Sequence, residues 1–205
     1  ENFITTAVKR GFQVFDVSRL RLLFVSSPPT PHGIRALVVH SDLTFVASGN
    51  EVIRFRRGKR DASSEKLGGT VTMLMAIGDM ILSYNKAGEV IGWDAKSMEE
   101  VVRIDLANCG VTASNGKAAH VTAWMHPFTY LNKLLLGAED GTLYLLNIRT
   151  HKLIHKFAAL GSAVTAMAQS PAVDVVGVGL SDGRVLVRSI KYDETLMEFK
   201  QTDGS

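Results

Sequence analysis

The sequence has little cysteine, a small net charge and no long apolar run. Cys109 is the single cysteine, so no disulfide can form within the chain and a reducing compartment is the simpler expectation. A formal net charge of +3 over 205 residues does not by itself indicate a nucleic-acid-binding protein. The apolar stretches have the length of strands and are interrupted by residues such as Gly137, Asp174 and Gly177. We therefore predict no membrane-spanning segment.

The sequence also lacks the motifs of common catalytic and metal sites. It contains no CxxC, HExxH or Gly-x-Ser-x-Gly pattern, and the segment GVGLSDG at 177–183 lacks the Gly-Lys-Ser/Thr ending of a phosphate loop. His151 and His155 are four residues apart, but they fall in a predicted turn and strand, where that spacing separates residues by ~13 Å. We therefore expect no catalytic residue, no metal, no cofactor and no small-molecule substrate.

What the sequence does contain is a repeated unit, seen most clearly at 124–157. Four short apolar runs are separated there by turn residues, among them Glu139-Asp140-Gly141 and Arg149-Thr150-His151. Each turn reverses the chain after a run of strand length, which predicts an antiparallel four-stranded meander. Its opening strand, with Val121-Thr122, has counterparts at Val71-Thr72 and Val164-Thr165.

The spacing of these counterparts indicates the fold. The three valines are 50 and 43 residues apart, and four-stranded units with periods of about 40–45 residues are typical of WD-type β-propellers. Blades of a propeller pack face to face, which explains the near-continuous apolar runs LYLLNI and VVGVGL. Trp93-Asp94 is the dipeptide after which WD repeats are named.

We predict an all-β fold, a WD-repeat β-propeller that is incomplete, with about five blades of a larger ring within residues 1–205. The chain opens within an apparent strand, which predicts a piece of something longer. The expected parts are a partial blade of three strands at 1–25, blades at 34–67, 70–105, 120–157 and 163–200, and an inserted loop at 106–119. The outer strand of the second unit, near DASSEKLGG, is expected to be irregular.

Three strings resemble a particular family. HPFTYLNKLLLG at 126–137, PAVDVVGVGL at 171–180 and YDETLMEFKQ at 192–201 are similar to the N-terminal propeller of the U-three small-nucleolar-RNA-associated protein twenty-one family. Members of this family are nucleolar WD-repeat proteins of the UTP-B complex of the small-subunit processome, with two tandem propellers and a helical C-terminal domain. The resemblance is close from about residue 120 to 201 and looser before it.

This resemblance implies a non-enzymatic scaffold in the nucleolus that supports pre-ribosomal RNA processing and small-subunit assembly. The implied partners are other UTP-B subunits and processome proteins, and pre-ribosomal RNA or the U-three snoRNP, contacted directly or through partners. Two alternatives remain open from the residues, since a fold alone does not determine a function. One is a generic WD-repeat adaptor or substrate receptor that binds a peptide; the other is a propeller enzyme, for which the channel-lining strands offer no convergent carboxylates or histidines.

A basic segment, RFRRGKR at 54–60, is the candidate contact site. Strand alternation predicts Ile53 and Phe55 on one face and Arg54 and Arg56 on the other. The alternative interpretation of the segment is a solvated edge without a partner. Every predicted turn between the third and fourth strands also carries a cation, whereas the turns at the opposite end are mixed in charge. We predict contacts with RNA phosphate or an acidic partner by Arg54, Arg56, Arg57, Lys59, Arg60, Arg149, Lys152 and Lys191.

Overall fold

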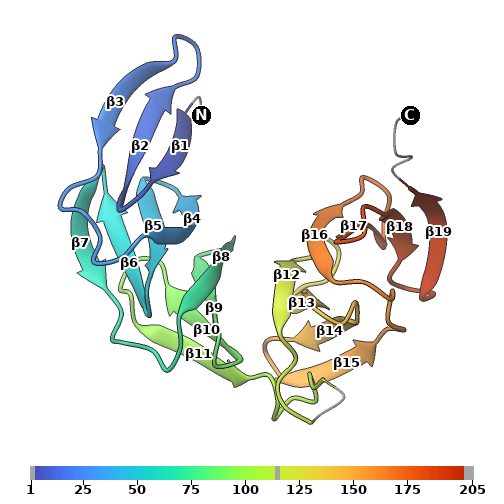
Figure 1. Ribbon diagram of the computed structural model, residues 1–205. Coiled ribbons are helices and arrows are strands. Elements are labelled where there is room, and N and C mark those ends of the chain that lie inside the picture. Colours follow the sequence, from blue (N-terminus) through green and yellow to red (C-terminus); the bar gives the residue numbers. More distant parts are fainter. Residues whose placement is uncertain (1–2, 114–115, 201–205) are drawn as a thin grey trace. The chain divides into compact units, whose positions relative to one another are not determined.

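The computed structural model describes residues 3–113 and 116–200, and every named element in these ranges is a β-strand. The strands form one three-stranded sheet and four four-stranded sheets, and in each sheet strands that follow one another in sequence pair antiparallel (Figure 1). Within these ranges no helix is long and apolar enough to cross a membrane. The predicted all-β fold of antiparallel meanders is confirmed.

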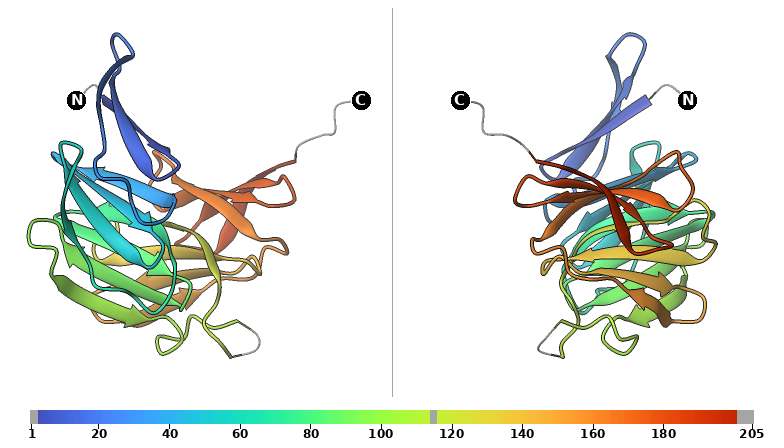
Figure 2. Two further views of the ribbon diagram at one scale, coloured as in Figure 1. Left: turned by 60° about the vertical axis from the view of Figure 1, so that its left-hand side comes forward. Right: turned by 90° about the vertical axis from the view of Figure 1, so that its right-hand side faces the viewer.

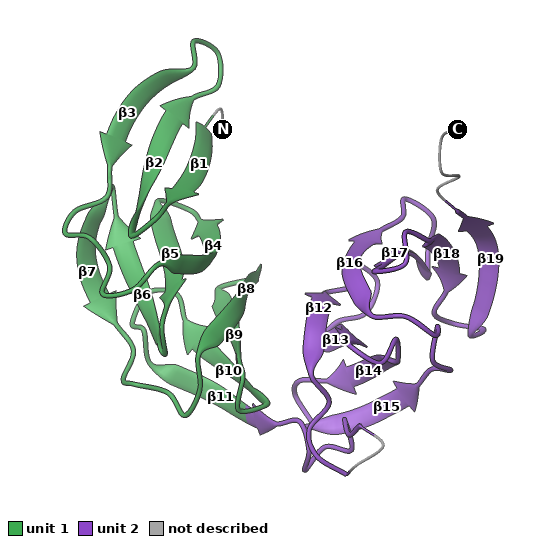
Figure 3. Cartoon of the chain, viewed as in Figure 1, with its two compact units in different colours: residues 1–103 green, residues 104–205 purple. Residues whose placement is uncertain are grey.

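The chain divides into two compact units, residues 1–103 and 104–205 (Figure 3). Unit 1 contains the three-stranded sheet of β1 (Phe3–Val8), β2 (Gly11–Asp16) and β3 (Arg21–Val25). It also contains the sheet of β4 (Ile34–His40), β5 (Leu43–Ser48), β6 (Glu51–Arg56) and β7 (Lys59–Ser63). Its last sheet is made by β8 (Val71–Ile77), β9 (Met80–Asn85), β10 (Glu89–Asp94) and β11 (Glu100–Asp105), the end of β11 crossing the boundary between the units.

Unit 2 contains two four-stranded sheets. The first is made by β12 (Val121–Met125), β13 (Lys133–Ala138), β14 (Leu143–Asn147) and β15 (Lys152–Lys156). The second is made by β16 (Val164–Gln169), β17 (Val175–Leu180), β18 (Val185–Ser189) and β19 (Glu194–Phe199). Assignment of residues 1–205 to one partial propeller with these blade limits stays a prediction.

Within each unit, consecutive sheets stack face to face and bury apolar side chains between them (Figure 2). In unit 1, Phe12 of β2 meets Phe55 of β6 edge to face, with ring centroids 5.2 Å apart. Phe45 of β5 packs in a second layer with Ile81 and Ile91 of the next sheet. Unit 2 has the same construction, with β13 and β14 packing against β16, β17 and β18. The middle sheet of unit 1, β4–β7, therefore has an apolar layer on each face.

The middle strands show this double burial in their sequences. All six residues of β5 are buried, and β9, β10, β13 and β14 are buried over most of their length, whereas the outer strands β7, β15 and β19 are largely exposed. For β5 and β6 the near-continuous apolar run follows from neighbouring sheets on both sides, as in other sheets covered on two faces.

Glycines close the turns between second and third strands. Gly141 and Gly183 have φ values of 82° and 85°, in the left-handed region that residues with a Cβ rarely adopt. At Gly141 a Cβ would also lie 2.6 Å from the Ser162 carbonyl oxygen of the connection to the next sheet. The glycine therefore permits both the turn and the close approach of the connection.

Two irregular segments lie between the sheets. The outer strand β7 forms over Lys59–Ser63, and the rest of DASSEKLGG is not in a strand. Residues 106–119, expected as an inserted loop, contain an isolated bridge between Thr112 and Ala118 but no named strand in the residues described. Leu106 and Val111 are fully buried, so this segment packs against the fold.

Candidate functional site

The basic segment forms one hairpin, made by the end of β6 and the start of β7. Arg56 pairs with Lys59 across a two-residue turn of Arg57 and Gly58, and both turn residues have positive φ, as type I′ hairpins require. Main-chain bonds fix the hairpin to the connection after β3: Ser27 N donates to Gly58 O at 2.7 Å, and Arg60 N donates to Ser27 O at 3.1 Å. The structure thus brings five predicted cations together on a rigid support.

Arg54 differs from the expectation. Arg54 is only 8% exposed, and its Nε donates to Asp61 Oδ1 at 2.9 Å. Its Nη1 donates to the main-chain oxygens of Ala95, at 3.0 Å, and of Lys96, both in the turn between β10 and β11 of the next sheet. Arg54 lies on the face of β6 opposite Phe55, as alternation predicts, but the neighbouring sheet covers that face. Arg54 is a cross-link between sheets.

The other four cations of the hairpin fall into two groups, one with ion pairs and one without. Arg56 forms ion pairs with Asp42 at 3.3 Å and with Asp61 at 3.5 Å, and Arg60 lies 3.8 Å from Glu51. Arg57 and Lys59 are exposed and form no ion pair with the residues that the structure describes. The charge available to a partner is therefore concentrated at Arg57 and Lys59.

Three predicted cations lie in unit 2. Arg149 and Lys152 belong to the β14–β15 hairpin, and Lys191 belongs to the β18–β19 turn; all three side chains are exposed. The Lys191 Nζ lies 5.1 Å from the centroid of the Tyr192 ring, a cation–π contact. Like Arg57, these cations occupy turns between third and fourth strands, so that each four-stranded sheet except β8–β11 presents predicted contact residues at that end.

An acceptor at the end of the third strand shapes these turns. Asp94 Oδ1 accepts from Lys96 N at 2.9 Å and Ser97 N at 2.7 Å, and Asn147 Oδ1 accepts equivalently in the β14–β15 hairpin. The hydrogen bonds from Ser97 and Lys96 lower the pKa of Asp94. The neighbouring Trp93 donates from Nε1 to Ser83 Oγ at 2.9 Å. The WD dipeptide therefore has a structural role.

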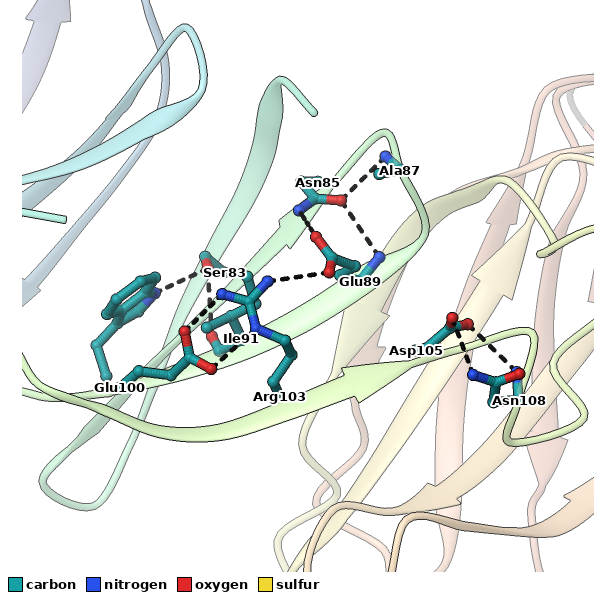
Figure 4. A network of polar contacts seen from close by, with 10 residues as sticks. Ser83, Asn85, Ala87, Glu89, Ile91, Glu100, Arg103, Asp105 and Asn108 are labelled. Atoms are coloured by element: carbon teal, nitrogen blue, oxygen red, sulfur yellow. Dashed lines mark hydrogen bonds and ion pairs between the residues drawn. The ribbon is translucent and has the colours of Figure 1, made fainter. Parts of the chain in front are cut away.

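A polar network that the sequence did not reveal lies on the same sheet (Figure 4). Arg103 of β11 donates to Glu89 Oε1 of β10 at 2.9 Å and to Glu100 Oε2 at 2.6 Å. Glu89 in turn accepts from Asn85 Nδ2 at 2.7 Å. The bonds to Glu100 and Glu89 raise the pKa of the Arg103 guanidinium. The network joins three strands and leaves Arg103 unavailable as a free cation.

Two shallow depressions accompany these features. One, of about 590 Å³, lies in unit 1 and is bordered by His32, Arg35, Asn50 and Thr70. The other, of about 560 Å³, lies in unit 2 and is bordered by Val173, Lys191, Tyr192 and Leu196. No group of three or more His, Cys, Asp or Glu side chains with metal-binding geometry occurs in the ranges described. The arrangement offers binding surfaces built from cations and apolar side chains.

Residues 4–205 match the family model described as the WDR36/Utp21 first beta-propeller. The chain belongs to this family. It is 36% identical to human WD repeat-containing protein 36 over 98% of its own length and 22% of that protein. It is also 36% identical to the U3 small nucleolar RNA-associated protein 21 homolog of Schizosaccharomyces pombe, and 25% identical to U3 small nucleolar RNA-associated protein 21 of Saccharomyces cerevisiae, over 98% and 99% of the chain.

This WDR36/Utp21 chain spans about a fifth of the length of these curated relatives, which are matched over 22–23% of their sequences. Among solved structures it is similar to the computationally designed Ika8 protein, with a TM-score of 0.73 and 22% identity, covering 96% of this chain and 58% of that one. It is also similar to the Cps50 (Swd1) beta-propeller domain of Myceliophteria thermophila, with a TM-score of 0.74 and 16% identity, covering 91% and 61%. These structures establish the propeller fold and nothing further.

Proposed function

We propose that this chain is part of a non-enzymatic scaffold of the small-subunit processome, which supports pre-ribosomal RNA processing and small ribosomal subunit assembly in the nucleolus. The observation that carries the proposal is the family match over residues 4–205, together with relatives that are named for association with U3 small nucleolar RNA. Other UTP-B subunits, processome proteins and pre-ribosomal RNA or the U3 particle are the proposed partners. They are contacted directly or through one another.

The surfaces described above fit a docking role. Rigid sheets present cations at the ends of third strands, and the Arg57–Lys59 tip is held by main-chain bonds rather than by a flexible tail. We propose that the exposed cations contact RNA phosphate or an acidic protein segment, namely Arg56, Arg57, Lys59, Arg60, Arg149, Lys152 and Lys191. Arg54 is left out of this set because its guanidinium is committed to Asp61 and two carbonyls.

The function is tested by depleting the full-length protein in cells of its source and re-expressing it. We expect depletion to reduce small-subunit ribosomal RNA relative to large-subunit RNA and to increase the unprocessed precursor, with both effects reversed by re-expression. Northern hybridisation of precursor and mature species measures this. Unchanged precursor and subunit ratios after complete depletion would contradict the proposed role.

The basic hairpin is tested separately by reversing the two cations without ion pairs. Arg57→Glu with Lys59→Glu in the full-length protein should weaken association with pre-ribosomal particles and flatten its salt dependence, because each phosphate contact releases counterions. Lys66→Glu with Lys86→Glu is the matched control, since both side chains are exposed and lie in connections at the opposite ends of their sheets. Equal sedimentation of the two double variants with particles across a salt series would show that the hairpin is only a solvated edge.

A further inference from the structure

One end of unit 2 exposes large apolar side chains. Phe128 is 79% exposed and Leu131 82% exposed in the loop between β12 and β13. Val173, in the β16–β17 turn, and Tyr192, in the β18–β19 turn, are each 66% exposed. In an antiparallel four-stranded sheet the first and third turns lie at the same end, so that these residues share one end of the two sheets. We call Phe128, Leu131, Val173 and Tyr192 the apolar end.

The loop that carries Phe128 and Leu131 is fixed on both sides. Within its own sheet, Ile148 N donates to Asn132 O at 2.8 Å. Toward the next sheet, Phe128 N donates to Gln169 Oε1 at 3.4 Å, and Thr129 Oγ1 donates to Asp174 Oδ1 at 3.3 Å. Phe128 and Leu131 are thus presented to solvent by an anchored backbone. Grouped exposed apolar side chains of this kind mark interaction sites more often than single ones do.

Positive charge surrounds the apolar end. Lys133 lies 4.4 Å from the Tyr130 ring centroid, Lys191 adjoins Tyr192, and the loop is bonded to the turn that carries Arg149. Two carboxylates, Asp174 and Glu194, border this depression, against the three cations Lys133, Arg149 and Lys191. The surroundings are therefore net positive and complement an acidic ligand.

The composition of the apolar end distinguishes between two kinds of acidic ligand. Single-stranded RNA gains affinity by stacking successive bases on free aromatic faces. Phe128 offers one such face, whereas Leu131 and Val173 offer none. One face of Tyr192 is already approached by Lys191. Aliphatic and aromatic side chains together instead suit the apolar anchors of a protein segment.

We propose that the apolar end docks a protein segment with large apolar side chains flanked by Asp or Glu. This inference names a partner class for the scaffold role proposed above and rests on it. The bound segment would place its apolar side chains against Phe128, Leu131 and Val173, and its carboxylates near Lys133, Arg149 and Lys191.

The test measures fluorescence anisotropy with purified full-length protein and four probes of equal length. The first is an acidic peptide with central Leu and Phe residues, the second has Ser in place of both, the third has Lys flanks, and the fourth is oligouridylate RNA. We expect the first probe to bind at least about tenfold more tightly than the others, since apolar anchors dominate such interfaces. Phe128→Ser with Leu131→Ser should remove this preference, and Ile154→Ser, on the outer strand β15, should leave it within about twofold.

A second variant keeps the result independent of folding. Lys191→Glu retains every apolar side chain and should weaken binding of the acidic peptide while improving that of the Lys-flanked peptide. The inference is overturned if the Ser peptide binds as tightly as the apolar peptide, or if Phe128→Ser with Leu131→Ser changes the affinity for none of the probes. It is also overturned if oligouridylate binds most tightly and the same variants abolish its binding. Precursor RNA processing after depletion is a separate readout, so failure of the docking site does not imply failure of the proposed function.

Discussion

Removing the carboxylate that pairs with Arg54 tests the cross-link between the second and third sheets. In Asp61→Asn the guanidinium keeps its bonds to the Ala95 and Lys96 carbonyls but loses its anion while remaining buried. Breaking a buried ion pair by removing one partner costs about 3–5 kcal/mol. The Asp61 side chain is 29% exposed, so water replaces part of the lost interaction and we expect a cost of about 2–3 kcal/mol.

Hydrogen exchange of the full-length protein is the appropriate assay, because local opening can be followed without assuming that a multidomain protein unfolds in two states. The relevant amides are those of the β10–β11 turn, such as Ala95 N, which donates to Asp79 O, and Met98 N, which donates to Asp94 O. A loss of 2–3 kcal/mol corresponds to exchange that is about 30–150 times faster.

Asp42→Asn is the matched control. It makes the same chemical change in a carboxylate whose pair with Arg56 is exposed, at 53% and 54% for the two side chains. Exposed pairs contribute about 0–1 kcal/mol, so exchange in the β10–β11 turn should change less than about fivefold. If Asp61→Asn has no larger effect than Asp42→Asn, Arg54 does not cross-link the sheets as described.

Two further predictions concern a close contact and an acid-sensitive turn. Gly137→Ala would place a Cβ 2.6 Å from Val164 Cγ1 and should destabilise unit 2 by about 1–3 kcal/mol. Gly179→Ala should be tolerated, because the nearest atom to its Cβ would be 3.5 Å away. Hydrogen exchange of the β16 amides in the full-length protein compares the two variants, and equal effects would contradict the packing. Because hydrogen bonds lower the pKa of Asp94, the ionised side chain stabilises the β10–β11 turn. This stabilisation is fully present above the usual pKa range of Asp and is lost as the pH falls through the lowered pKa. Asp94→Asn should keep the turn, because the amide oxygen of Asn147 makes the equivalent hydrogen bonds in the β14–β15 hairpin. The variant should also remove the acid response in the hydrogen exchange of residues 96–97, and an unchanged pH profile in Asp94→Asn would refute the assignment.

The sequence predicted the sheets well because its local signals agree with one another. Repeated Val-Thr strands and Gly turns recur at blade spacing, and each turn glycine has the positive φ that its position needs. Alternation correctly predicts that Arg54 lies opposite Ile53 and Phe55, but it does not predict the burial of Arg54, since the pattern of one strand does not show that a second sheet covers that face. The contacts of Arg54 with Ala95 and Lys96 are 41 and 42 residues away, which no local pattern specifies.

The apolar end of unit 2 was also not predicted. Phe128 and Leu131 are residue types that are common in protein cores. Only their position in the turn segment Pro127–Asn132 distinguishes them from the core residues of this chain. That placement was the available signal, because large apolar side chains within a turn have no sheet face to cover them. The Arg103 network was missed for a different reason: Glu89 joins it across the sheet, fourteen residues away, although Glu100 is near in sequence.

Co-purification of U3 small nucleolar RNA tests the central claim most directly. The full-length protein is captured from nuclear extract under native conditions, and the U3 RNA is quantified against another small nucleolar RNA of similar abundance. The proposed processome role predicts strong enrichment of U3 RNA together with small-subunit precursor RNA. Recovery of both small nucleolar RNAs at the level of a mock purification would contradict it.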